Sequence, residues 1–195
     1  MSSKNIKKNK GESFFTTPNI LSFSRIPLLF IAAYALLYNL SPIVSFILIL
    51  VIFLMDLADG YIARLLKEET RFGEAVDEIV DRIVENVLFI VFAYLQYIPI
   101  WIPLIMIVRA FVVDGTVFYH RINAPTAKKS ESYKALIRSD ISRGGYGFAK
   151  MLLFSVLAFY PILDSFAKDL VLALAVFVVL FSVFRGIIKI REAKK

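Results

Sequence analysis

The chain has 195 residues, no Cys, one His and a net charge of +7, and 58% of its residues are hydrophobic. This apolar share exceeds that of ordinary soluble domains and favours a lipid bilayer as the environment. It excludes a disordered chain, and the lack of Cys excludes a disulfide scaffold and a thiolate zinc site. In such a protein the positive charge indicates basic cytoplasmic loops and contact with anionic membrane lipids, with no nucleic acid as partner.

Six apolar segments follow one another along the chain, and each is long enough to cross a hydrocarbon core of about 30 Å. Turn-forming residues separate them, including Pro42, Pro99 and the pair Gly144-Gly145. We therefore expect an all-α fold, an integral membrane bundle of six transmembrane helices with a short N-terminal interfacial segment. The predicted spans are residues 20–38, 42–66, 73–97, 100–121, 146–163 and 167–188.

Three parts of the chain are expected: a basic cytoplasmic and interfacial segment (1–17), a six-helix domain (18–190) and a basic tail (191–195). Lys and Arg gather at both ends of the chain and in the second-to-third and fourth-to-fifth loops. The other three loops together contain only Lys168. Because positive charge favours the cytoplasmic side, both termini and any site at that end are predicted to be cytoplasmic.

Four aspartates stand at helical spacing in the second and third spans. Asp56 and Asp59 share one helix face at the end of the second span, and Asp77 and Asp81 share one face near the start of the third. A short loop makes the two helices antiparallel neighbours. Four carboxylates can therefore converge at the cytoplasmic end of this helix pair.

Carboxylates inside a membrane boundary need a counter-charge, and bound divalent cations are the simplest one. Four aspartates around two ions would also stabilise a transferring phosphoryl group. Gly60, Ala63 and Gly73 leave a groove beside the acids, and Arg64 at its rim could grip a diphosphate. The alternative is that the glycines serve helix packing.

The run Asp56-x2-Asp59-Gly60-x2-Ala63-Arg64-x8-Gly73-x3-Asp77-x3-Asp81 resembles the signature of the CDP-alcohol phosphotransferase family. The resemblance implies transfer of a substituted phosphoryl group from a CDP-linked lipid to an alcohol, with release of CMP, in phospholipid biosynthesis. It also implies two Mg²⁺ or Mn²⁺ ions per active site and a homodimer. By position it implies metal ligands at Asp56, Asp59, Asp77 and Asp81, a general base at Asp81, and CDP contacts at Gly60, Ala63, Arg64 and Gly73.

The first span is similar to the Pro-Asn-x-Leu-Thr-x-x-Arg opening of phosphatidylglycerophosphate synthases, through the run from Thr17 to Ile26. This likeness adds Asn19 to the expected CDP-binding residues and makes glycerol 3-phosphate the leading acceptor. Departures from those enzymes at Glu78, Arg82 and Ala110 leave inositol phosphate, serine, another alcohol or a second lipid open as acceptor. A diacyl donor and an archaeal ether-lipid donor are equally compatible with the sequence.

The remaining intramembrane charges are expected to pair by depth, Glu85 with Arg109 and Arg82 with Asp114. Arg109 has a second interpretation, that it binds a phosphate on the acceptor. The run Gly144-Gly145-Tyr146-Gly147 predicts a flexible entry to the fifth span, where basic residues would bind a phosphorylated alcohol. The expected acceptor-binding residues are Arg109, Arg138, Arg143 and Lys150.

Two functions of other classes are also compatible with this pattern. A divalent-cation transporter could use the same acids, but they cluster at one end of the spans and not at the membrane midplane. A non-catalytic scaffold would tolerate Asn in place of Asp77 or Asp81.

Overall fold

A computed structural model describes residues 17–66, 71–123 and 140–193 of the chain. The described part is helical and contains no strand, as the all-α prediction requires. The helices are α1 (Thr17–Leu37), α2 (Pro42–Leu66), α3 (Arg71–Tyr94), α4 (Trp101–Asn123), α6 (Asp140–Leu157) and α7 (Ser165–Ala193), with a 3₁₀ turn η1 (Tyr160–Ile162) between the last two.

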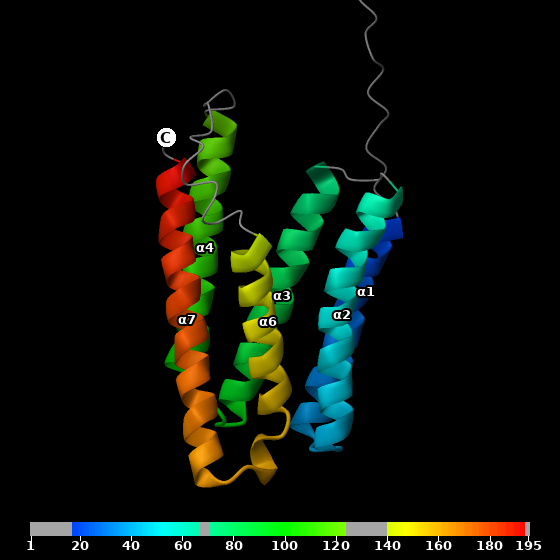
Figure 1. The fold of residues 1–195 in the computed structure, drawn as a ribbon, viewed down its shortest axis with the longest axis vertical. Helices are drawn as coiled ribbons and strands as arrows, with labels where there is room; N and C mark the ends of the chain where they lie inside the picture. The colour runs from blue at the N-terminus through cyan, green and yellow to red at the C-terminus, as the bar shows by residue number, and fades with distance from the viewer. Residues whose placement is uncertain (1–16, 67–70, 124–139, 194–195) are drawn as a thin grey trace, which may run out of the picture.

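The helices run up and down along one common direction (Figure 1). In this arrangement α1 packs against both α2 and α3, α4 packs against α7, and α6 contacts α2 and α7. The start of α1, the end of α2, the start of α3 and the end of α7 all lie at the same end of the bundle (Figure 1). Residues near these helix ends are therefore brought to one level, although the chain reaches them at very different positions.

Aromatic side chains form the centre of the bundle. Phe154 of α6 lies between Phe89 and Phe92 of α3 and Phe53 of α2, with ring centroids 4.8, 6.0 and 5.9 Å away. Other large apolar side chains face outward, such as Phe111, which is 78% exposed. An apolar exterior around a packed apolar core is the arrangement expected of helices surrounded by lipid.

Among the described residues, three helices are long and apolar enough to cross a membrane, through the stretches Asn19–Leu37, Pro42–Ile62 and Ser165–Arg191. The prediction of six spans is supported for these three alone. Charged side chains interrupt α3 and α4, and the apolar stretch of α6, Gly144–Leu157, is shorter.

The fifth helix differs from its prediction at both ends. It runs from Asp140 to Leu157, whereas the sequence pattern placed it over residues 146–163. Gly144 and Gly145 lie inside the helix, so the expected flexible entry at this point is wrong. Both glycines are exposed, and the backbone hydrogen bonds of the helix continue through them at a modest cost in helix propensity. Pro161 lies in η1, beyond the end of the helix.

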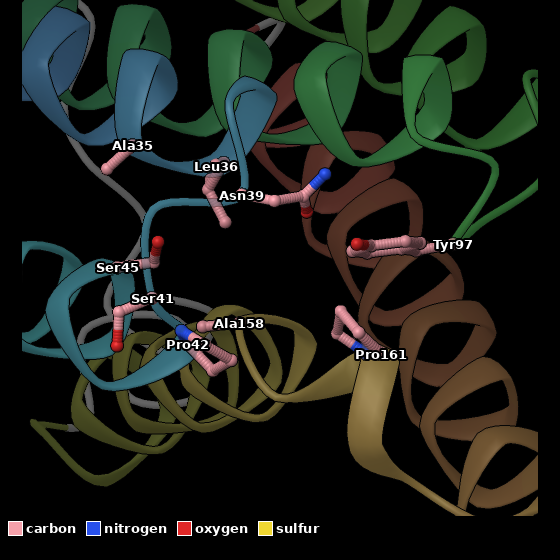
Figure 2. Close-up of a pocket in the computed structure, with 9 residues that line it drawn as sticks. All are labelled: Ala35, Leu36, Asn39, Ser41, Pro42, Ser45, Tyr97, Ala158 and Pro161. Carbon is pink, nitrogen blue, oxygen red and sulfur yellow. The ribbon is translucent and has the colours of Figure 1, made fainter.

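A cavity of about 470 Å³ opens at the other end of the bundle, where α1 connects to α2. Asn39 and Tyr97 are among the side chains that surround it (Figure 2). Pro42, at the start of α2, also lines it, and Asp56 follows fourteen residues later on the same helix. Because a helix rises about 1.5 Å per residue, roughly 20 Å separate the two, and the cavity is not part of the aspartate site.

Candidate active site

The structure brings the four predicted aspartates together between α2 and α3. One carboxylate oxygen from each of Asp56, Asp59 and Asp77 lies within 4.8 Å of the other two. Asp81 joins them through a shared contact with Arg25 of α1. We call these four residues the aspartate cluster. Their convergence follows from spacings of three and four residues on α2 and α3, both of which pack against α1.

Arg25 lies at the centre of the aspartate cluster, and its side chain is fully buried. Its Nη1 atom is closest to Asp56, 3.6 Å from Asp77 and 3.9 Å from Asp59. Its Nη2 atom donates a hydrogen bond of 2.9 Å to Asp81. The sequence predicted a metal as the counter-charge and gave Arg25 no role. Arg25 is therefore the main residue of the site that the prediction missed.

A pattern on α1 could have revealed Arg25. Asn19, Ser22 and Arg25 follow one another at intervals of three in an otherwise apolar helix, and all three are buried. Ser22 donates a hydrogen bond of 2.7 Å to Asp59. Polar residues repeated on one side of a membrane-spanning helix usually face a polar interior. The first helix therefore completes the site formed by the other two.

The residues expected to bind CDP lie around the aspartate cluster on three helices. Asn19 lies on α1, six residues before Arg25, and Gly73 is half-buried four residues before Asp77. Gly60 is exposed next to Asp59, and a side chain there would meet no atom of the described residues within 4 Å. Helix packing within the described chain therefore does not require this glycine. Ala63 and Arg64 lie in α2, and their side chains fall outside the described part.

A second charged cluster lies one turn further along α3, around Glu85. This carboxylate is buried, accepts a hydrogen bond of 2.6 Å from the Tyr146 hydroxyl, and lies 3.3 Å from Arg82 and 3.7 Å from Lys150. Arg82 also bonds to Asp114 of α4 at 3.1 Å. The predicted pair of Arg82 and Asp114 is therefore confirmed.

The predicted pair of Glu85 and Arg109 is wrong. Arg109 of α4 points toward α7 and donates a hydrogen bond of 3.2 Å to the backbone carbonyl of Ser182. The cause is a close approach of α4 to α7 at Gly186, where an added Cβ would lie 3.3 Å from Arg109 Nε and 2.7 Å from a Val113 methyl. Glu85 and Arg109 were expected to pair because they lie at a similar depth in the membrane. The rotation of α4 about its axis instead directs the Arg109 side chain toward α7.

Positive charge exceeds negative charge around Glu85. Lys150 and Arg185 lie over the Tyr146 ring, 4.8 and 5.0 Å from its centroid. Arg109 is 8% exposed, and its Nη1 has no hydrogen-bond partner within the described part of the chain. We call the four cations contributed by α3, α4, α6 and α7 the basic layer. Its members are Arg82, Arg109, Lys150 and Arg185.

Two expected acceptor-binding residues cannot be placed beside this basic layer. Arg138 lies outside the described residues, and Arg143 belongs to α6 but its side chain is not among those described. Of the four predicted residues, the structure therefore brings Arg109 and Lys150 to the region around Glu85 and Tyr146.

The oxygen atoms of the aspartate cluster fit a divalent cation. Carboxylate oxygens are the ligands that hard cations such as Mg²⁺ prefer, and three of them lie within 4.8 Å of one another. Arg25 supplies one positive charge against four carboxylates, so most of the negative charge is left for another cation to neutralise.

Comparison with known proteins agrees with the signature. The sequence model described as CDP-alcohol phosphatidyltransferase matches residues 15–183. The chain is 31% identical over 128 residues to the cardiolipin synthase (CMP-forming) of Rattus norvegicus, covering 63% of this chain and 41% of that protein.

Two further relatives carry other names. One is a CDP-diacylglycerol–glycerol-3-phosphate 3-phosphatidyltransferase of Aquifex aeolicus, 36% identical over 80 residues, which are 41% of this chain and 42% of the relative. The other is a CDP-diacylglycerol–inositol 3-phosphatidyltransferase of Schizosaccharomyces pombe, 34% identical over 96 residues, 48% and 39% of the two chains. The matched stretch thus spans less than half of each of these three relatives.

Proposed function

The chain belongs to the CDP-alcohol phosphatidyltransferase family, and from this premise we propose that it transfers a phosphatidyl-type group from a CDP-linked lipid to a polar alcohol and releases CMP. The observation that carries the proposal is the convergence of Asp56, Asp59 and Asp77, whose oxygens lie within 4.8 Å of one another at the family signature. The donor is a diacyl or an archaeal ether lipid, and the reaction belongs to phospholipid biosynthesis.

The aspartate cluster would hold two divalent cations, Mg²⁺ or Mn²⁺. Asp56, Asp59 and Asp77 would be the principal ligands, and Asp81 would complete the site. When bound, the metals supply positive charge that stabilises the departing CMP phosphate.

Asp81 would act as the general base on the acceptor. It lies one helical turn beyond Asp77, toward the basic layer, and takes the proton of the acceptor hydroxyl. The hydroxyl oxygen then forms a bond to the lipid-linked phosphorus, and the bond from that phosphorus to the CMP oxygen breaks. One displacement suffices, without a covalent enzyme intermediate.

The CDP moiety would lie in the groove beside the aspartate cluster. The open surface at Gly60 supports this placement, because a ligand can approach the helix backbone there. The residues proposed to contact CDP are Asn19, Gly60, Ala63, Arg64 and Gly73.

The basic layer would select a phosphorylated alcohol. Arg109 supports this step because its buried Nη1 lacks a hydrogen-bond partner among the described residues, and an acceptor phosphate would supply one. Lys150 would contribute a second charge, and Arg138 before α6 and Arg143 in the first turn of α6 would complete the pocket. Glycerol 3-phosphate is the acceptor we propose.

A lipid alcohol is the second candidate acceptor. The relative from Rattus norvegicus is named as a cardiolipin synthase that forms CMP, which favours a lipid alcohol as acceptor. Inositol phosphate, favoured by the name of the Schizosaccharomyces pombe relative, and serine complete the set to be tested.

The test is CMP release by the purified protein with Mg²⁺ and a CDP-linked lipid of either type. Glycerol 3-phosphate, phosphatidylglycerol, inositol 1-phosphate and serine are supplied in turn. We expect release with one acceptor and its loss in Asp81→Asn. Release should be retained in Asp169→Asn, because Asp169 is exposed near the start of α7, at the end of the bundle away from the aspartate cluster. No release with any acceptor, together with uptake of a divalent cation into proteoliposomes, would overturn the proposal in favour of a transporter.

We further propose that the protein is a homodimer in the membrane, with both termini and the aspartate cluster on the cytoplasmic side. The sequence contains no Cys, so single cysteines can report orientation. In intact cells a membrane-impermeant maleimide should label Lys168→Cys at the start of α7, and should label Arg191→Cys near its end only after permeabilisation. The reverse pattern would contradict the orientation.

A further inference from the structure

We propose that Arg25 is a built-in counter-cation that competes with divalent metal for the aspartate cluster, so that metal binding and the release of Arg25 are one coupled event. The inference rests on the proposed function, because it takes the aspartate cluster as a metal site. It adds to that function a residue of the first helix that controls how the site is loaded.

The first observation is that Arg25 contacts the same three carboxylates that a metal would bind. Asp77 Oδ1 lies 3.6 Å and Asp59 Oδ2 3.9 Å from Nη1, and Asp56 is closer still. These residues also form the group whose oxygens lie within 4.8 Å of one another. A guanidinium and a metal ion repel each other strongly at such distances in a buried site. We therefore expect Arg25 to give up some of these contacts when a metal binds the same carboxylates.

The second observation is that the guanidinium is buried but poorly hydrogen-bonded. Arg25 is fully buried, yet its Nε and Nη1 make no hydrogen bond of good geometry within the described part of the chain, and neither does Asp77 Oδ1. A structural arginine in such a position usually makes paired, planar hydrogen bonds to a carboxylate. One hydrogen bond, from Nη2 to Asp81, holds Arg25 in the cluster, and its contacts with the other three carboxylates rest on charge, which another cation can replace.

The third observation is the helix that carries Arg25. Pro27 lies inside α1, two residues further on, and has no backbone N–H to donate to the preceding turn. The turn that carries Arg25 can therefore adjust more readily than the turns of α2 and α3 that carry the aspartates. Movement of Arg25 away from the cluster needs a small change in one helix and leaves the other two in place.

The coupling between metal binding and the release of Arg25 would stabilise the protein in the membrane before a metal binds. Four carboxylates brought together in a region of low dielectric repel one another, and a protein without metal would lose stability or bind unwanted cations. A tethered guanidinium partly neutralises the cluster until the metal arrives. Arg25 is thus a positioning residue, which acts through the aspartates and not on the substrate.

The experiment measures Mn²⁺ binding and thermal stability of the purified full-length protein in detergent, without substrate. Arg25→Gln removes the charge and keeps most of the side-chain length, and Arg25→Lys keeps a charge that cannot span four carboxylates. Lys189→Gln is the matched control, because it removes a cation that pairs with Glu78 outside the cluster at 2.8 Å.

We expect Arg25→Gln to bind Mn²⁺ at least about tenfold more tightly than the wild type, because a competing charge is gone. Its melting temperature should fall in EDTA and rise more on addition of Mn²⁺ than that of the wild type. Arg25→Lys should lie between the two, and Lys189→Gln should match the wild type. Unchanged or weaker Mn²⁺ binding by folded Arg25→Gln would overturn the inference.

If Arg25→Gln folds only with Mn²⁺ present, that result supports the inference. If it does not fold at all, Arg25→Lys decides, since Mn²⁺ binding no tighter than in the wild type overturns the proposal. Failure of the proposed function looks different, because CMP release would then be absent with every acceptor, whereas the Mn²⁺ affinities of the wild type and the Arg25 variants would still report on this inference.

Discussion

The aspartate cluster and the basic layer are both charged and lie next to each other along α3, but they are unbalanced in opposite senses. Four carboxylates surround one guanidinium in the first, whereas four cations surround Glu85 and Asp114 in the second. Uncompensated charge is costly inside a membrane protein. Each region therefore calls for a partner of the opposite sign, a cation in the first and an anionic group such as phosphate in the second.

The largest effect should come from removing one charge of the aspartate cluster. In Asp77→Asn we expect the rate of CMP release to fall by roughly a thousandfold or more, because a metal ligand and its transition-state charge are lost. The measurement is CMP release at saturating donor and acceptor with Mg²⁺, beside Asp169→Asn. Activity within tenfold of the wild type would remove Asp77 from the proposed machinery.

A single substitution in the basic layer should lower the stability of the fold. Glu85→Gln leaves Arg82 and Lys150 facing a neutral amide in a buried position. We expect a loss of roughly 3–5 kcal/mol in the free energy of unfolding, since breaking a buried pair strands its cations. Chemical denaturation in detergent checks this. Asp81→Asn is the comparison, and an equal loss in both variants would show that the two regions do not differ in this respect.

A smaller effect should distinguish the binding of the acceptor from the binding of the donor. Arg109→Ala should raise the KM for glycerol 3-phosphate by roughly 10- to 100-fold, because it removes a charge-assisted hydrogen bond to phosphate. The KM for the CDP-linked lipid, measured in the same variant, should change little. Equal increases in both values, or a loss of folding with unchanged kinetics, would assign Arg109 a structural role.

The smallest effect tests the close approach that turns Arg109 toward α7. In Gly186→Ala the new methyl would meet Val113 at 2.7 Å and Arg109 at 3.3 Å, so that these side chains or the helix backbone must shift. We expect a loss of about 1–3 kcal/mol in stability. Gly115→Ala is the matched control on α4, where nothing described lies within 4 Å, and it should be neutral or slightly stabilising. Similar melting temperatures for both variants would contradict this explanation.

The sequence predicted what depends on local spacing. Intervals of three and four residues correctly brought together the aspartates of two helices, and four of the six predicted spans both begin and end within about three residues of the described helices. The same reasoning found the pair of Arg82 and Asp114, which lies at one depth on adjacent helices.

The failures lie where contacts depend on how helices pack and rotate. Arg25 precedes Asp56 by thirty-one residues, and no periodicity within either helix shows that α1 lies against both α2 and α3. The depth of Arg109 was readable from the sequence, but the direction of its side chain is set by the contact at Gly186. Gly144 and Gly145 suggested a break, although the helix continues through them.

One helix, α3, carries Asp81 of the first region and, four residues later, Glu85 of the second. The helical rise therefore fixes the separation of the two regions at about 6 Å along the helix axis. No closing lid is needed to set this interval, and thermal motion of the loops leaves it unchanged. Inserting a single residue between positions 81 and 85 would rotate the two carboxylates by about 100° relative to each other. Such an insertion would put the regions out of register without removing any charged group.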